Sequence, residues 1–161
     1  MSRPAERVQQ PQEADPLRLW FRFVRLNRRV TQAIGGELKV IGLSIPQFDL
    51  ISTLTEREGV TQQELAQRLY VTKGNVSGLV DRLVEAELVE RRALAGDRRS
   101  HALHLTPKGR ALAERGLTAQ QAYVARTLGR LAPADLAELE RIVLAWRDAA
   151  RADAAHAEAA E

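Results

Sequence analysis

The sequence contains no cysteine, and its only methionine is Met1. Disulfide bonds, zinc sites with thiolate ligands and redox sensing through a thiol are therefore excluded. Aromatic residues make up only 4% of the 161 residues, so the core has to be built mainly from leucine, valine, isoleucine and alanine. This mixture favours helices.

Long apolar runs are missing as well. No stretch approaches the ~18 consecutive apolar residues of a membrane-spanning helix, and the first 16 residues lack the hydrophobic core of a signal peptide. We therefore expect a cytoplasmic protein that makes no membrane contact.

The sequence also lacks the usual signatures of catalysis. It has no glycine-rich phosphate loop and no nucleophile motif, and His101, His104 and His156 do not have the spacing of metal ligands. We expect no enzyme activity, no metal site and no cofactor. We interpret His101 and His104 as strand residues beside DNA or solvent.

Positive charge is present, but it is unevenly distributed. The net charge is only +3, yet residues 68–110 hold nine Lys or Arg against five Asp or Glu, and residues 17–41 hold six against one. Residues 132–161 have the opposite bias, with three against seven. A basic surface attracts polyanions even on a nearly neutral protein, although an ordinary solvated face explains either cluster taken alone.

The length fits a single domain between two tails. Residues 1–16 and 151–161 lack periodic large apolar side chains and are predicted to be flexible tails. Between them, apolar periodicity and capping signals predict helices that begin near Leu17, Ser44, Thr61, Thr72, Thr106 and Pro133. The Ser44 helix and the Thr61 helix each start with a capping box, closed by Gln47 and Glu64.

The helix that begins at Thr72 has two contrasting faces. Its apolar residues fall at the spacing of a complete core stripe: Val76, Leu79, Val80, Leu83 and Val84. Its other face is small and polar with two cations, and comprises Thr72, Lys73, Gly74, Asn75, Ser77, Gly78 and Arg82. Such a face fits the ~12 Å major groove of DNA, and small side chains let the backbone approach the bases.

Two extended runs follow this helix, residues 88–94 and 100–105, separated by the turn Ala95–Asp97. The order of helix, turn, helix and hairpin describes a helix-turn-helix with a wing. Arg98 and Arg99 at the hairpin tip suit a DNA minor groove, and Asp97 is close enough to orient Arg99 through a bidentate pair. The alternative is that these arginines only keep the turn soluble.

The terminal helices carry apolar surface that needs a partner. The first helix, 17–41, has two apolar stripes rather than one, and the last helix has a seam with spacings of three and four residues, formed by Leu136, Leu139, Val143, Trp146 and Ala150. The seam predicts contact with another helix.

The middle of the chain resembles the MarR family of bacterial transcription regulators. The resemblance rests on "KGNVSGLVDRL" (73–83), "LVER" (88–91), "DRR" (97–99) and "LTPKG" (105–109), and extends over nearly the whole chain. It implies a mostly α fold in which a winged-helix lobe, about 44–106, joins a helical dimerisation lobe, about 17–42 and 107–150. It also implies a recognition helix at 72–86, a wing arginine at Arg99 oriented by Asp97, and a phosphate contact by Arg98.

Further expectations follow from the resemblance. Members of the family bind double-stranded DNA as homodimers, and many respond to small aromatic or anionic effectors. The corresponding effector site would be lined by Trp20, Phe23, Arg25, Asn27, Phe48 and Asp49, although core or dimer packing is an alternative role for the aromatic residues.

One residue departs from the family pattern. Glu87 stands where the family usually has the glycine that ends the recognition helix, and a left-handed conformation there costs a residue with a Cβ roughly 1 kcal/mol. The sequence therefore leaves open how this helix ends and at what angle the wing leaves it.

The predicted function is that of a transcriptional regulator, most simply a repressor that binds a pseudo-palindromic operator. The alternative is a winged-helix adaptor that binds proteins without reading DNA. Cations at Lys73, Arg82 and Arg99 oppose the adaptor.

Overall fold

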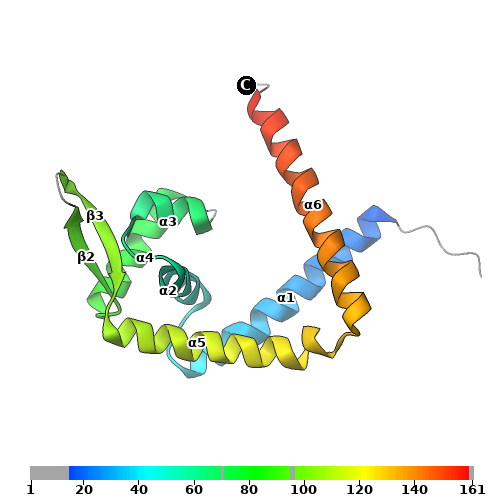
Figure 1. Ribbon diagram of the computed structural model, residues 1–161, viewed down its shortest axis with the longest axis horizontal. Coiled ribbons are helices and arrows are strands. Elements are labelled where there is room, and N and C mark those ends of the chain that lie inside the picture. The colour runs from blue at the N-terminus through cyan, green and yellow to red at the C-terminus, as the bar shows by residue number, and fades with distance from the viewer. Residues whose placement is uncertain (1–14, 70, 95–96, 160–161) are drawn as a thin grey trace, which may run out of the picture.

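The computed structural model describes residues 15–69, 71–94 and 97–159. Six α-helices and a small antiparallel sheet form two lobes joined by one long helix, as Figure 1 shows. The elements are α1 (Pro16–Val40), α2 (Ile45–Glu56), β1 (Val60–Thr61), α3 (Gln62–Leu69), α4 (Lys73–Glu85), β2 (Val89–Leu94), β3 (Asp97–Leu105), α5 (Pro107–Arg126), the short 3-10 helix η1 (Leu128–Arg130) and α6 (Pro133–Ala159). This architecture confirms the predicted winged helix-turn-helix.

Side chains next to the first turns set several helix starts. Ser44 and Gln47 form the predicted capping box of α2, and Thr61 and Glu64 form that of α3. The backbone N–H of Thr61 donates to the Glu64 carboxylate, which lowers the pKa of Glu64. Thr72 precedes α4 as predicted, but its side chain makes no capping hydrogen bond. The expected side-chain cap of α4 is therefore wrong, although the helix begins where the sequence indicated.

The hydrophobic core lies in the winged-helix lobe. Its fully buried side chains come from α2, α3, α4 and the sheet, with Leu38 from the end of α1 and Ala113 from the start of α5. The predicted inner stripe of α4 takes part, because Val76, Leu79, Val80 and Leu83 are all buried. In the described residues the core contains no buried polar or charged side chain.

Glycines allow α5 to approach its neighbours closely. A Cβ on Gly109 would lie 1.9 Å from the carbonyl oxygen of Leu88, and one on Gly116 would lie 2.5 Å from the ring of Phe48. Neither distance leaves room for a side chain. The first half of α5 therefore packs directly against the end of the recognition helix and against α2, which fixes the winged lobe on the long helix.

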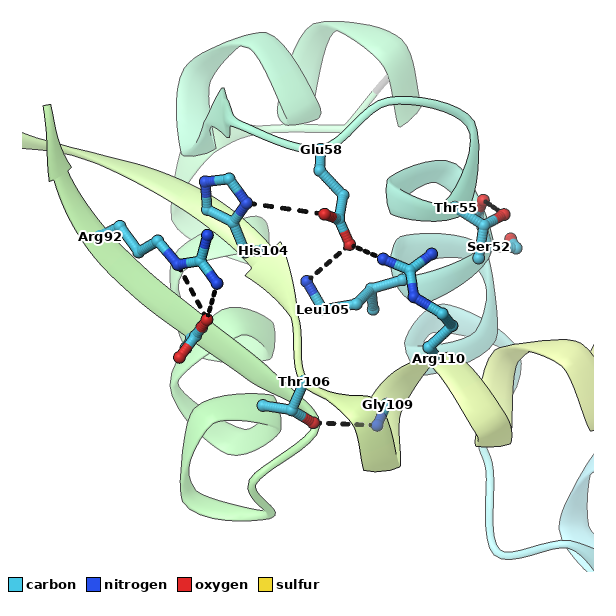
Figure 2. A network of polar contacts seen from close by, with 10 residues as sticks. Ser52, Thr55, Glu58, Arg92, His104, Leu105, Thr106, Gly109 and Arg110 are labelled. Carbon is cyan, nitrogen blue, oxygen red and sulfur yellow. Dashed lines mark hydrogen bonds and ion pairs between the residues drawn. The ribbon is translucent and has the colours of Figure 1, made fainter.

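The start of α5 also satisfies backbone groups at the end of α4. The Thr106 hydroxyl donates to the carbonyl oxygen of Glu87 (2.7 Å) and accepts from the N–H of Gly109 (2.9 Å), the second contact being visible in Figure 2. The Lys108 ammonium donates to the carbonyl oxygen of Ala86 (2.8 Å). Carbonyl groups at a helix C-terminus lack intrahelical partners, and a cation there also interacts well with the helix dipole.

The C-terminal helix is longer than the sequence indicated. Helix α6 continues to Ala159, so the predicted tail from residue 151 is helical over most of its length. The segment is rich in alanine, which has the highest helix propensity of all residues. The predicted tail at 1–16 lies outside the described residues up to residue 14; Asp15 caps α1, and Pro16 is its first residue.

Glu87 adopts the left-handed backbone conformation with φ of 59°. The recognition helix therefore ends in the conformation that glycine usually adopts at this position. The Cβ of Glu87 makes this conformation less favourable than it would be for glycine. Its ion pair with Lys108, 3.7 Å long and largely exposed, contributes little in return.

We predict that Glu87→Gly stabilises the protein by a few tenths to about 1 kcal/mol, because glycine has no Cβ penalty at positive φ. Thermal and urea unfolding would measure the change. Glu85→Gly, two residues earlier at the last position of α4, is the matched control and should not stabilise the protein, because Glu85 has a helical backbone. An unchanged or lower melting temperature for Glu87→Gly would contradict the assignment of strain.

Candidate DNA interface

Helix α4 presents its polar side to solvent. Thr72, Asn75 and Arg82 are exposed, while Val76 and Val80 on the opposite side are buried in the core. The backbone of Lys73 starts the helix, but its side chain lies outside the described part of the structure. The predicted reading face is therefore formed by one rigid element whose back is fixed by packing.

Two glycines on this face have no packing role inside the chain. A Cβ built on Gly74 or Gly78 would meet no other atom within 4 Å. Ser77 lies between them and is half-buried. The surface over this turn of α4 is thus open to an approaching backbone or base, which fits the predicted close contact with DNA.

An ion pair that the sequence analysis missed links the recognition helix to the wing. Asp81 on α4 accepts from the Arg91 guanidinium on β2 at 2.5 Å. The pair is partly exposed, so it contributes on the order of 0–1 kcal/mol to stability. Its effect on geometry matters more, because it joins the two elements predicted to contact DNA.

Arg98 and Arg99 belong to strand β3 of the wing and not to the turn before it. Strand β3 begins at Asp97, so the prediction that Asp97 belongs to the turn is wrong; Ala95 and Gly96 lie outside the described residues. The register pairs Ala93 with His101 and Leu94 with Asp97, so residues 98–100 lie between two successive pairs. Such an irregularity bends a strand locally.

The side chains of Asp97, Arg98 and Arg99 are outside the described part of the structure. Their backbone positions place Arg98 and Arg99 in the irregular segment of β3. The proposed bidentate pair between Asp97 and Arg99 and the phosphate contact of Arg98 remain predictions.

A hollow of about 380 Å³ lies beside the recognition helix, between α2 and α4. Asp49 from α2 lines it together with Asn75 and Arg82 from α4, and its walls are mainly apolar. Burial raises the pKa of Asp49. A carboxyl group and a guanidinium group thus share a partly enclosed site that touches the reading helix.

The other residues predicted to bind an effector do not share this hollow. Trp20 and Phe23 contact Trp146 of α6, with ring centroids 6.1 and 4.8 Å apart. Phe48 is buried in the core against α5, and Asn27 is exposed on α1.

Arg25 belongs to a separate surface on α1. It lines an open groove of about 500 Å³ with Arg22, Leu26, Arg28, Arg29 and Gln32. Helical geometry explains the separation, because residues 23 and 25 point about 200° apart on a helix with 3.6 residues per turn. Within one chain the predicted effector residues therefore lie in five places.

The described residues give no sign of metal chemistry or of a membrane span. Among them no group of three or more His, Cys, Asp or Glu side chains is placed to hold a metal ion. No helix in the same part of the chain is long and apolar enough to cross a membrane.

Comparison with known proteins identifies the family. The MarR family model matches residues 41–100, which run from the end of α1 into the wing. The HTH-type transcriptional repressor Rv2887 of Mycobacterium tuberculosis is 30% identical over 130 residues, covering 81% of this chain and 94% of the relative. The chain belongs to the MarR family of transcriptional regulators. An uncharacterized HTH-type transcriptional regulator of Bacillus cereus is 30% identical over 105 residues, covering 65% of this chain and 69% of the relative.

Solved MarR structures share the fold. AbsC of Streptomyces coelicolor, a MarR family transcriptional regulator, superimposes with a TM-score of 0.77 and 26% identity, over 89% of this chain and 99% of AbsC. CouR of Rhodococcus jostii RHA1, solved with p-coumaroyl-CoA bound, gives a TM-score of 0.71 over 82% of this chain and 93% of CouR, and at 24% identity it shows the fold alone. The named relatives agree with a role in DNA-binding transcriptional regulation.

We predict that Arg99→Ala weakens binding to a duplex selected by the wild-type protein from a random library, with a salt dependence lower by about one counterion per lost phosphate-type contact. Arg7→Ala, which removes the same charge from the N-terminal segment, is the control and should have a smaller effect. Titrations at several salt concentrations measure both. Equal affinities and equal salt slopes would show that the wing does not touch DNA.

Proposed function

We propose that this MarR family protein is a homodimeric repressor that binds a pseudo-palindromic operator. The observation that carries the proposal is the exposed polar face of α4, which is backed by a buried apolar stripe and linked to the wing through Asp81 and Arg91. In the proposal α4 reads the major groove, Arg99 enters the minor groove and Arg98 contacts phosphate. Relatives named as repressors support the direction of regulation.

Exposed apolar side chains support the dimer. The large exposed apolar side chains concentrate on α1, the end of α5, η1 and α6. Apart from Val40 at the C-terminal end of α1, those on the helices α1 and α6 are Leu17, Leu19, Trp20, Phe21, Phe23, Leu26, Leu139, Ile142, Val143, Leu144 and Trp146. Figure 1 shows that much of α6 extends away from the rest of the chain. Contiguous apolar surface on this scale marks an interaction site, and a second copy would cover it.

We expect sedimentation at micromolar concentration to give a stable dimer, and Val143→Asp to shift it toward monomer, because a buried unpaired carboxylate is costly. Val40→Asp is the control. Val40 is 86% exposed at the end of α1, away from α6, whereas Val143 is 52% exposed. A wild-type protein that sediments as a stable monomer would contradict the homodimer.

Symmetry then sets the geometry of the operator. A single recognition helix reads only a few base pairs, so two copies related by a two-fold axis would place equivalent helices one DNA turn, about 34–36 Å, apart. Footprinting on DNA flanking the gene would show both the specificity and the spacing of the half-sites. The same experiment separates the regulator from a protein-binding adaptor, which would protect no defined segment.

We further infer that a small anion with an apolar body releases the DNA. The hollow between α2 and α4 supports this role, since its walls are mainly apolar and Arg82 supplies a positive charge. This site differs from the effector site expected from the sequence, because it includes Asp49 but not Trp20 or Phe23. The aromatic thioester bound by CouR supports a ligand of this chemical type.

Binding in this hollow would act on DNA through α4. Asn75 and Arg82 belong to both the hollow and the reading face, so a ligand would compete for them or move the helix. To lower the DNA affinity tenfold, the ligand has to bind the DNA-free form of the protein more tightly than the DNA-bound form by about 1.4 kcal/mol.

We predict that the affinity for salicylate falls as the pH rises from acid toward neutral. As the pH passes the raised pKa of Asp49, its carboxyl group becomes a carboxylate that repels the salicylate anion. In Asp49→Asn this pH dependence should disappear and binding at neutral pH should tighten. Calorimetric titration measures both proteins, and urate serves as a second anion. Release of DNA by hydrogen peroxide but by no organic anion would overturn the ligand model.

A further inference from the structure

The carboxylate of Glu58 contacts the end of β3 and the start of α5, which lie 47 and 52 residues further along the chain. Glu58 lies between α2 and β1, and Figure 2 shows it facing His104 and Leu105 of β3 and Arg110 of α5. Its Oε1 accepts from the backbone N–H of Leu105 at 3.2 Å and from the Arg110 guanidinium at 2.5 Å. Its Oε2 lies 3.6 Å from Nδ1 of His104.

The contact with Leu105 replaces a missing strand partner. Strand β1 has only two residues, pairing Val60 with Leu103 and Thr61 with Ala102, and the N–H of Gly59 donates to the carbonyl oxygen of Leu103. Continued in the same register, Glu58 would stand opposite Leu105. The backbone instead turns at Gly59, where φ is 77°, and the Glu58 side chain takes the N–H of Leu105.

These contacts hold the base of the wing. His104 and Leu105 end the strand that begins with Asp97, Arg98 and Arg99, and Arg110 lies in the first turns of α5. The carboxylate is 31% exposed and His104 is 19% exposed, so both are partly shielded from water. A charge-assisted network of this kind fixes direction better than a single exposed pair.

We propose that Glu58 is a positioning residue for DNA binding, which sets the angle of the wing relative to α5 and thereby presents Arg99 to the minor groove. The proposal rests on the proposed function, because it needs the wing to contact DNA. Glu58 touches no DNA in this scheme and acts through β3.

The direction of the change in DNA affinity distinguishes a positioning role of Glu58 from a simple effect of its charge. Removing a carboxylate makes the protein more positive, which by itself strengthens binding to polyanionic DNA. Glu58→Gln keeps the size of the side chain and an oxygen acceptor for Leu105, but loses the charge that holds Arg110. We therefore expect Glu58→Gln to bind the selected duplex about tenfold more weakly, against the trend of its charge.

Glu90→Gln is the matched control. Glu90 lies opposite His104 in the strand register and forms an ion pair with Arg92. Glu90 and Arg92 both lie on β2, so their ion pair does not link separate elements. Its loss removes one negative charge from the same region without releasing the wing. We expect its affinity for the duplex to be equal to or slightly higher than that of the wild type.

A double-mutant cycle with Arg99→Ala identifies what Glu58 acts through. If Glu58 works by presenting Arg99, adding Glu58→Gln to Arg99→Ala should cause at most about a twofold further loss, whereas independent effects would multiply. Circular dichroism and the melting temperature of each variant show that the fold is intact. Glu58→Ala serves as a stronger variant if it folds.

The possible outcomes distinguish a failure of the proposed function from a failure of the proposed role of Glu58. Selection that yields no defined DNA sequence would remove the proposed function itself. A defined sequence bound equally well by wild type and Glu58→Gln, or multiplicative losses in the cycle, would overturn the role of Glu58 alone. No effect of Arg99→Ala would also overturn that role while leaving the regulator in place.

Discussion

The close contact between the start of α5 and the end of the recognition helix is the constraint on which the rest of the structure depends. Gly109 lies against the carbonyl group of Leu88 with no room for a Cβ, and Thr106 and Lys108 bind the last carbonyl groups of the α4 turn. Because α5 is a single helix of 20 residues, this contact fixes the DNA-reading elements relative to the α1 and α6 lobe.

The two lobes use their apolar side chains differently. The winged-helix lobe buries its leucines and valines within one chain, and its core includes only the C-terminal end of α1. The α1 and α6 lobe leaves large apolar side chains exposed, and the cluster of Trp20, Phe23 and Trp146 covers only a part of them. A monomer with such a surface is incomplete, which makes association the natural way to stabilise this half of the molecule.

The reading face and its surroundings are coupled through polar contacts between separate elements. Asp81 ties α4 to β2, and Glu58 ties β3 to α5, so the wing is held at both of its strands. The hollow between α2 and α4 is lined by Arg82 of the same helix. A ligand there and a nucleic acid on the reading face would therefore act on a single element.

The sequence by itself determined the features that depend on neighbouring residues. The capping boxes at Ser44 and Thr61, the buried stripe of α4 and the proline start of α5 each lie within a few positions of one another, so their hydrogen bonds and faces follow from helical geometry. The family motif in residues 73–109 likewise indicated the winged helix, whereas the left-handed backbone at Glu87 came only from the structure.

Only the tertiary structure decided which distant residues meet. Glu58 and Arg110 are 52 residues apart, and no local pattern marks them as partners. The separation of Phe23 from Arg25 and the placing of Phe48 in the core depend on how α1 and α2 rotate against their neighbours, which is set by packing in three dimensions. For the same reason the hollow between α2 and α4 could not be inferred, because a cavity is defined by the faces that two helices turn toward each other.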